Sequence, residues 1–365
     1  MKVALQIWRF DPGAGERRLQ DFEVDAPEWA TLLDVLDLIK DRQDGTLSYR
    51  KSCRMMICGS CGMRMDGGAV LACKTRMAPI VEEGRVPVIS AMGNLPVLKD
   101  LVVDMSPFWS KIRAMDPYLK TGYEEIPEKE FIVPASRMDP IKKEALCIMC
   151  GCCVSECNSL ESDPDFFGPA ALAKGMRFVG DPRDQATIER LRHYNDEHGI
   201  WNCTRCYFCN ERCPKGVDPR DAIAKLGAES MRLGFDTDMG AKHAKWFVVS
   251  AKTTGWLRET ELVPKTQGIK QALKETKFAL SLAKKGKVPL PFPPHVADRV
   301  QEARKLYEIV KVQGKDGAAG IVQGERALGR VEKHDEQFAQ AAARGPYGEG
   351  SFPAPYLPEV QKEGA

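Results

Sequence analysis

Thirteen cysteines are the residues of this 365-residue chain with the most specific chemistry, and they fall into three tight groups. The groups span residues 53–73, 147–157 and 203–213, and the rest of the chain contains no cysteine. Such clustering suits metal coordination, because several thiolates must converge on one small centre. Small disulfide scaffolds have a much higher cysteine density. The sequence therefore predicts metal-bound thiolates in a reducing, cytoplasmic compartment.

The first group has the spacing C-x4-C-x2-C with a distal fourth cysteine, formed by Cys53, Cys58, Cys61 and Cys73. This is the plant-type spacing of a 2Fe–2S centre. Small residues between the cysteines allow the loop to wrap closely around a cluster, so that backbone N–H groups point at its sulfides. A structural zinc site is the alternative, but such sites usually pair two short knuckles, which this spacing does not match.

The second and third groups share the spacing C-x2-C-x2-C-x3-C, and each member of one recurs 56 residues later in the other. In two-cluster ferredoxins with this spacing, the fourth cysteine of each run ligates the other cluster. That rule predicts a crossed assignment. One 4Fe–4S cluster would be held by Cys147, Cys150, Cys153 and Cys213. The other would be held by Cys157, Cys203, Cys206 and Cys209.

Three clusters with four ligands each use all cysteines except Cys152, which we expect to pack as a small buried apolar side chain. Zinc remains the competing metal for the doubled runs. The five histidines have no carboxylate partners at metal-ligand spacing, so surface or capping roles are predicted for them.

The elements that position these cysteines predict an α+β fold. Strands at residues 2–10 and 22–26, a helix over 31–42 and short strands around VLACKT and VPVIS indicate an N-terminal β-grasp ferredoxin domain. Short helices around the two later groups, the last over 222–235, indicate an α-helical two-cluster domain. A C-terminal extension follows, with a Pro-rich linker and an amphipathic helix over 297–312. The predicted domains are 1–105, 106–235 and 236–365.

The composition and motifs of the chain argue against nucleic-acid binding, membrane spanning, secretion and nucleotide binding. Lys and Arg number 53 against 51 Asp and Glu, so no basic surface predicts nucleic-acid binding. No apolar run is long enough to span a membrane, and no secretory signal is recognisable. A G-x-G-x-x-G turn and a P-loop are both missing from the sequence, so nucleotide binding is not indicated. We expect no catalytic residue.

Over residues 1–235 the chain resembles the iron–sulfur subunit of succinate dehydrogenase and fumarate reductase. The matching text is KSCRMMICGSCGMRMDGG, LPVLKDLVVDMSPFW, CIMCGCCVSEC and CPKGVDP. The resemblance implies an electron-transfer subunit that lacks the dicarboxylate site. It implies a relay between an FAD flavoprotein subunit and a membrane anchor, and indirectly quinone. By resemblance the 2Fe–2S cluster lies nearest the flavin, and the cluster on Cys203 lies nearest the membrane.

Three departures from the family pattern concern the last cluster. Most members lack cysteine at the position of Cys206 and have a 3Fe–4S cluster, so here a second 4Fe–4S cluster is expected, with 3Fe–4S as the alternative. The tryptophan pair expected after Cys157 is missing from NSLESDPDFF, and Thr204 replaces a histidine. These differences resemble the subclass whose membrane-side partner is similar to heterodisulfide reductase.

The resemblance therefore implies a peripheral protein on the cytoplasmic side of the membrane, held by partner subunits. The same parts serve succinate oxidation and fumarate reduction, so both directions stay open. The alternative function is the iron–sulfur subunit of another flavin-linked oxidoreductase, such as a heterodisulfide-reductase-like enzyme or a thiol-coupled fumarate reductase.

Overall fold

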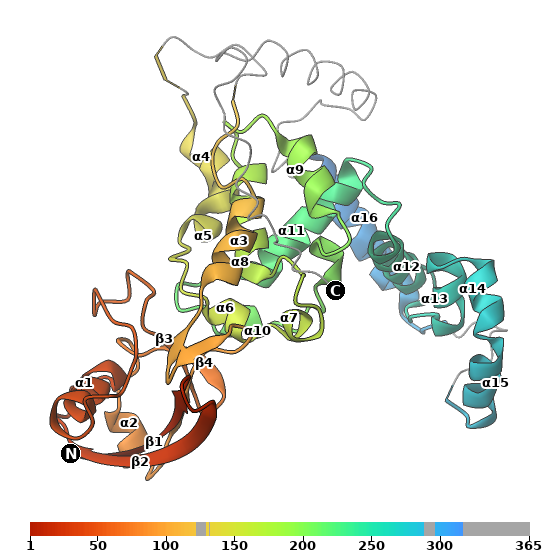
Figure 1. Cartoon of the computed structure of the whole chain (residues 1–365). Helices are drawn as coiled ribbons and strands as arrows, with labels where there is room; N and C mark the ends of the chain where they lie inside the picture. Colours follow the sequence, from red (N-terminus) through yellow and green to blue (C-terminus); the bar gives the residue numbers. More distant parts are fainter. Residues whose placement is uncertain (122–128, 131, 288–295, 317–365) are drawn as a thin grey trace, which may run out of the picture.

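The computed structural model describes residues 1–121, 129–130, 132–287 and 296–316, with side chains described up to residue 308. A sheet domain occupies one end of the molecule, helices form its middle, and a helical arm extends from the opposite side (Figure 1). The two cores are separate clusters of buried residues. The cysteine groups lie in the sheet domain and in the central helices.

The sheet domain is built on a hairpin of two long strands, β1 (Lys2–Asp11) and β2 (Glu16–Asp25), paired antiparallel. Every second residue of β1 is buried, among them Val3, Leu5 and Ile7, as the alternating sequence requires. The sheet has the order β2-β1-β5-β3-β4, with β5 parallel to β1. Its other strands are β3 (Gly62–Met65), β4 (Gly68–Leu71) and β5 (Val88–Ser90).

One helix, α1 (Leu32–Arg42), contributes five buried apolar side chains to the core of this sheet. It begins at a capping box, in which the Thr31 hydroxyl accepts from the Asp34 N–H and the Asp34 carboxylate accepts from the Thr31 N–H. The domain is completed by α2 (Ala78–Glu82), β6 (Val97–Lys99) and β7 (Val102–Val103).

The central helices pack around α8 (Pro169–Val179), in which nine of eleven residues are buried. It contacts α3 (Ser106–Ala114), α5 (Lys142–Ala145), α6 (Cys152–Ser155), α9 (Thr187–Tyr194) and α11 (Pro219–Arg232). The shorter elements of this region are α4 (Ala135–Met138), η1 (Asp139–Ile141), α7 (Asn158–Ser162), η2 (Ile200–Asn202) and α10 (Phe208–Glu211).

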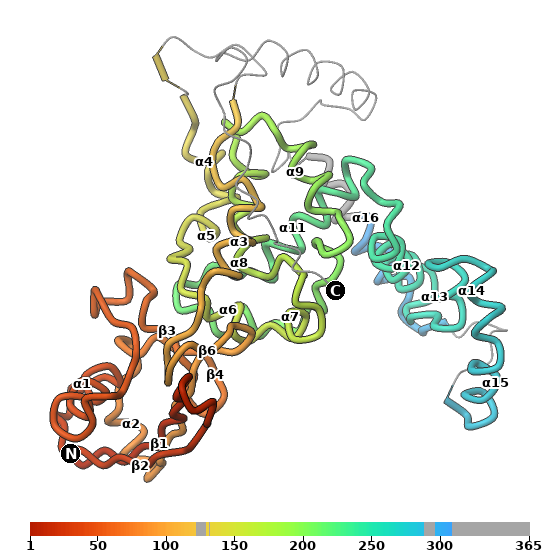
Figure 2. Tube along the Cα trace, viewed as in Figure 1, coloured from red at the N-terminus to blue at the C-terminus, as the bar shows by residue number. Residues whose placement is uncertain are grey.

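The arm contains α12 (Met239–Thr254), α13 (Glu259–Thr266), α14 (Ile269–Lys274), α15 (Thr276–Lys284) and α16 (Val300–Asp316). The trace in Figure 2 shows α12 to α15 following one another away from the central helices. α16 returns to α12, where the Arg304 guanidinium donates to the carbonyls of Lys252 and Thr253. Among the described residues, no helix has the length and apolarity needed to cross a membrane.

The predicted α+β class is confirmed, as are the first strand and the helix over 31–42. The helix predicted over 222–235 is observed as Pro219–Arg232. It begins earlier because proline is favoured at the first helical position, and it ends before Gly234, which has φ +88°. The amphipathic helix predicted over 297–312 is observed as α16. The Pro-rich linker falls largely on residues 288–295, outside the described residues, and the boundaries at 105 and 235 stay predictions.

A buried ion-pair network ties β1 to the loop that leads toward the first cysteine group. The Arg9 side chain is 6% exposed and pairs with Asp100 at 2.9 Å and Asp44 at 2.6 Å. The Asp100 carboxylate also accepts from the backbone N–H of Ser48 at 2.9 Å. These bonds, and the neighbouring carboxylates, raise the pKa of Arg9 even though its burial opposes this. The network therefore holds the loop after α1 against β1.

Replacing this arginine should strongly destabilise the sheet domain. Arg9→Ala leaves two carboxylates without their partner, and breaking a buried pair in this way costs about 3–5 kcal/mol. Arg18→Ala is the matched control, because Arg18 is exposed and lies opposite Arg9 in the β1–β2 register. Its expected cost is below about 0.5 kcal/mol. Urea unfolding of both variants measures the difference, and equal midpoints would contradict the role of the network.

Candidate metal centres

The first three cysteines lie on an irregular loop between α1 and β3. Three backbone N–H groups donate to the sulfur of Cys53, from Met55 at 3.4 Å and from Ile57 and Cys58 at 3.3 Å. The Ser60 hydroxyl lies 3.1 Å from the Cys58 sulfur and lowers the pKa of Cys58 to about 6. The loop thus surrounds the sulfurs of Cys53 and Cys58 with hydrogen-bond donors.

The β3–β4 hairpin brings the fourth cysteine to this loop. Cys61 immediately precedes β3, Cys73 follows β4, and the Ala72 N–H donates to the Cys61 carbonyl at 3.1 Å. Burial raises the pKa of Cys61 to about 12, and the nearby Cys73 and Cys58 thiols contribute to the rise. The four cysteines predicted for the 2Fe–2S cluster are therefore neighbours.

The second and third cysteine runs meet across a small apolar cavity. Four cysteines line it, three from the second run and one from the third: Cys147, Cys150, Cys153 and Cys213. Burial raises the pKa of Cys153, and Cys150, Cys147 and Cys213 are among the neighbours that raise it further. The crossed set predicted for one 4Fe–4S cluster is thus brought together.

The other crossed set also comes together, around the last cysteine of the second run. Burial raises the pKa of Cys157, and the neighbouring Cys203 and Cys206 thiols add to this effect. The pKa of Cys209 is raised to about 12, again by burial and then by Cys203, Cys157 and Cys206. Each run therefore supplies three cysteines to one set and one cysteine to the other.

The 56-residue repeat extends from the cysteines to the backbone. Met149 and Arg205 both have φ +57°, and Gly151 and Tyr207 have φ +80° and +70°. Each pair is separated by 56 residues, and the second pair caps the short helices α6 and α10. A non-glycine residue at positive φ is strained. Tyr207 adopts it with its ring stacked under the Arg220 guanidinium, 4.3 Å from the ring centroid.

The remaining cysteine, Cys152, is fully buried beside Cys150 in the core that includes the sheet domain. The interaction with the Cys150 thiol, followed by burial, raises the pKa of Cys152. Its surroundings therefore keep it a neutral thiol, in line with the packing role that the sequence predicts.

Comparison with known proteins agrees with this arrangement. Residues 4–110 match the model of a 2Fe-2S iron-sulfur cluster binding domain, and residues 145–217 match that of a 4Fe-4S dicluster domain. The chain is 33% identical over 317 residues to the 8-methylmenaquinol:fumarate reductase iron-sulfur subunit of Wolinella succinogenes. That match covers 85% of this chain and 99% of the relative.

The chain belongs to the family of iron–sulfur subunits of fumarate reductase and succinate dehydrogenase. A fumarate reductase iron-sulfur subunit of Mycobacterium tuberculosis is 41% identical over 228 residues, covering 61% of this chain and 91% of that one. The fold resembles a chain of the Mycobacterium smegmatis Sdh1 complex in the apo form. The TM-score is 0.59 at 24% identity, and the match covers 64% of this chain and 98% of the other. The names of these relatives match the predicted succinate dehydrogenase or fumarate reductase subunit and not the alternative function.

In this iron–sulfur subunit the first two cysteine groups are in direct contact. Gly59, on the first loop, has φ +72°, and a Cβ added there would lie 2.8 Å from the Cα of Cys150. A Cβ at Gly62 would lie 3.0 Å from the Cys150 carbonyl oxygen. Cys153, from the same set as Cys150, is in turn an electrostatic neighbour of Cys209. The three groups therefore follow one another through the molecule.

Two side chains of the sheet domain, Asn94 and Arg64, bind the segment between the two crossed cysteine sets, and we call the Asn94 contacts the Asn94 clamp. The Asn94 amide donates to the carbonyls of Val154 at 2.8 Å and Cys157 at 3.0 Å. The Arg64 guanidinium forms a two-point ion pair with Glu156, at 2.7 and 3.2 Å. Sequence spacing does not indicate these contacts, because they join residues 60 or more positions apart.

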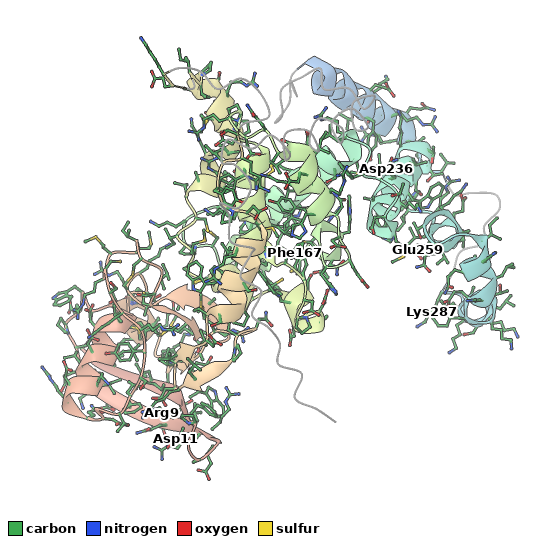
Figure 3. The ribbon with its side chains drawn as sticks, turned by 45° about the horizontal axis from the view of Figure 1, so that its top comes forward. Arg9, Asp11, Phe167, Asp236, Glu259 and Lys287 are labelled. Carbon is green, nitrogen blue, oxygen red and sulfur yellow. The ribbon has the colours of Figure 1, made fainter. Side chains whose placement is uncertain are left out.

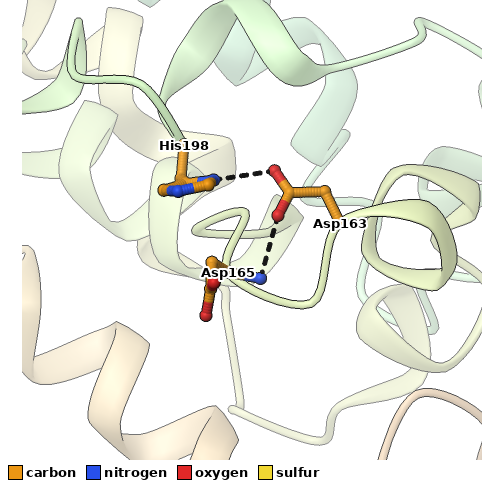
Figure 4. A group of neighbouring side chains, drawn as sticks. All are labelled: Asp163, Asp165 and His198. Atoms are coloured by element: carbon orange, nitrogen blue, oxygen red, sulfur yellow. Dashed lines mark hydrogen bonds and ion pairs between the residues drawn. The ribbon is translucent and has the colours of Figure 1, made fainter.

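A second group of interacting side chains, which the sequence does not predict, lies beside the last cysteine set. Asp163 accepts hydrogen bonds from the ring Nδ1 of His198 at 2.9 Å and from the Asp165 N–H at 3.1 Å (Figure 4). The Asn202 amide also donates to Asp163, at 2.8 Å. The ligand atoms of the two aspartates and the histidine lie within 4.8 Å of one another. The surface or capping role predicted for His198 is thus supplemented by a carboxylate partner 35 residues away. The bonds tie the loop after α7 to Asn202, next to Cys203.

The contact at Gly59 predicts a specific sensitivity. In Gly59→Ala the new methyl group meets the backbone of Cys150, which should separate the first loop from the second cysteine group. Gly67→Ala is the matched control, because Gly67 also has positive φ but open space around its Cα. Both variants carry about 1–2 kcal/mol of backbone strain. Only Gly59→Ala adds overpacking, of roughly 1–3 kcal/mol. Thermal loss of visible absorbance measures the difference, and equal loss would contradict the contact.

Proposed function

We propose that this chain relays single electrons through three clusters in the order of its cysteine groups. A 2Fe–2S cluster is held by Cys53, Cys58, Cys61 and Cys73. The middle 4Fe–4S cluster is held by Cys147, Cys150, Cys153 and Cys213. The terminal 4Fe–4S cluster is held by Cys157, Cys203, Cys206 and Cys209. The crossed convergence of the last two sets is the observation that carries the proposal.

The separation of the thiols favours clusters over single zinc ions. Zinc binds thiolates at 2.3 Å in a tetrahedron, so two sulfurs on one zinc ion lie about 3.8 Å apart. All thirteen cysteines are described, and among described residues only one group of three ligands has its atoms within 4.8 Å of one another. That group is Asp163, Asp165 and His198, and it contains no cysteine. The absence of such a close group of thiols supports a larger inorganic core.

The exposure of the cysteines indicates the two ends of the relay. Only Cys58 and Cys206 are exposed among the thirteen, and they belong to the first and the last set. The middle set includes the buried Cys150 and Cys153. Iron–sulfur clusters supply one-electron redox chemistry, with potentials that depend on burial and on hydrogen bonds to sulfur. Electrons would enter and leave at the two sets that have an exposed cysteine, and the middle set, which has none, would connect them.

The first set lies on a surface suited to a flavoprotein subunit. Met55 and Ile57 extend from the same loop as Cys53 and Cys58, and their side chains are exposed. Apolar side chains around a redox centre favour partner docking, because their burial on association excludes water. We propose that the FAD-bearing subunit covers this loop.

The last set would face the membrane-side partner. Tyr207 and Phe208 are exposed next to Cys206. Thr204 stands where the resemblance implies a histidine, and the sequence after Cys157 does not contain the implied tryptophan pair. We propose a partner similar to heterodisulfide reductase subunits rather than an ordinary quinone pocket. One relative is named for 8-methylmenaquinol and fumarate, which supports a quinol-linked reaction. The subunit would sit peripherally on the cytoplasmic side of the membrane.

Charge on the first loop should separate this subunit from its flavoprotein. Met55→Glu with Ile57→Glu places two carboxylates at the proposed interface, where burial of unpaired charge is costly. We expect at least about a tenfold loss of FAD recovered with the tagged complex, and of succinate-dependent dye reduction. Val86→Glu is the control, because Val86 is exposed elsewhere on the sheet domain. Full recovery of an active FAD subunit by the double variant would contradict the proposed face.

The ligand role of Cys206 has its own test. Cys206→Ser should convert the terminal cluster into a three-iron one, which is paramagnetic when oxidised, whereas an oxidised 4Fe–4S cluster is silent. Low-temperature electron paramagnetic resonance of the oxidised complex should therefore show a new signal. Cys152→Ser, at the one cysteine outside the three sets, should show none. An unchanged spectrum for Cys206→Ser would exclude Cys206 as a ligand.

A further inference from the structure

The helices α14 and α15 leave their apolar side chains uncovered. Ile269 and Leu273 on α14 are 73% and 69% exposed, and Phe278 and Leu280 on α15 are 62% and 57% exposed. Neither helix has a buried residue. The two helices form the far end of the arm (Figure 1), and Lys287, just after α15, lies across the molecule from Arg9 (Figure 3). Nothing in the described part of the chain covers these side chains.

The sequence of α15 separates apolar and basic residues onto opposite faces. Phe278 and Leu282 are four residues apart and therefore share a face, which Ala279 and Ala283 extend. Leu280 lies at the edge of this face, three residues before Ala283. The opposite face carries Lys277, Ser281 and Lys284 at helical spacing, and Lys285 follows directly after the helix. A helix that is basic on one face and apolar on the other is typical of segments that lie in a membrane interface.

The positive charge of this segment is unusually concentrated. Residues 269–287 contain six lysines and one glutamate, whereas the whole chain has a net charge of only +2. In the described structure none of these lysines pairs with a carboxylate, although lysines elsewhere do, such as Lys225 with Glu144. The glutamate, Glu275, accepts a hydrogen bond from Gln271. The segment therefore offers uncompensated positive charge beside an apolar face.

We propose that α14 and α15 form an interfacial anchor that binds a membrane surface rich in anionic lipid. The apolar face would enter the boundary between head groups and acyl chains, and the lysines would remain among the anionic head groups. A protein partner is less well matched, because lysine is depleted at protein–protein interfaces. The proposal rests on the side chains of the arm alone, independently of the cluster assignment.

Vesicle sedimentation of the intact, cluster-loaded chain tests the anchor. We expect binding to phosphatidylcholine vesicles containing 30% phosphatidylglycerol, and little binding to pure phosphatidylcholine. Lys277→Gln, Lys284→Gln and Lys285→Gln together should weaken binding about a hundredfold, at roughly fivefold for each lysine. Phe278→Ser with Leu280→Ser should weaken it by at least about tenfold. High salt should reduce binding, because the Debye length falls to about 3 Å at 1 M.

Matched controls remove the same groups elsewhere on the surface. Lys99→Gln, Lys242→Gln and Lys305→Gln remove three exposed lysines outside 269–287, and Leu19→Ser with Leu98→Ser removes two exposed leucines. Both controls should bind like the unaltered chain, and the visible spectrum verifies that each variant keeps its clusters. Equal binding to neutral and anionic vesicles, or equal losses in the α14–α15 variants and the control variants, would overturn the proposal. The proposal would also be overturned if the intact chain bound no vesicles and the α14–α15 variants instead lost a partner subunit.

Discussion

The exchange of one cysteine between two runs is the constraint on which the central structure depends. Cys157 belongs by sequence to the second run but lies with the third, and Cys213 does the reverse. Two segments separated by 56 residues must therefore be held side by side. Their short helices α6 and α10 contact each other, α8 packs against α6, and α11 packs against α10. In the proposed holoprotein the clusters are cross-links of this core as well as electron carriers. The same cross-links would then determine both how the helices are arranged and how far apart the redox centres lie.

The sheet domain has its own apolar core, but it contacts the central helices directly. Cys150 and Cys152 pack into its apolar core, and the loop at Gly59 contacts the backbone of Cys150. Asn94 then fixes the carbonyls of Val154 and Cys157, so that one domain holds the segment linking the two crossed sets. Because dense packing of this kind resists small displacements, the distances between neighbouring centres are set by side-chain contacts. A relay needs this rigidity in its middle and accessible residues at its ends.

The sequence reveals local patterns, but it does not reveal contacts between residues that are far apart in the chain. Cysteine spacing and the alternation in β1 are local, so the three sets and the α+β class could be predicted. The ion pairs of Arg9, the Asn94 clamp and the Asp163–His198 pair join residues 35 to 91 positions apart. No periodicity records such contacts, since they arise only when the elements pack. The exposed faces of α14 and α15 were likewise hidden, because an amphipathic pattern predicts a helix but not whether its apolar face is covered.

Three clusters of defined size require a fixed content of iron and of acid-labile sulfide, which chemical analysis measures together. We predict that the anaerobically isolated chain contains about ten iron atoms and about ten acid-labile sulfides, with no zinc, as one 2Fe–2S and two 4Fe–4S clusters require. Stoichiometric zinc, or an iron content that corresponds to only one or two clusters in the intact protein, would contradict the central claim.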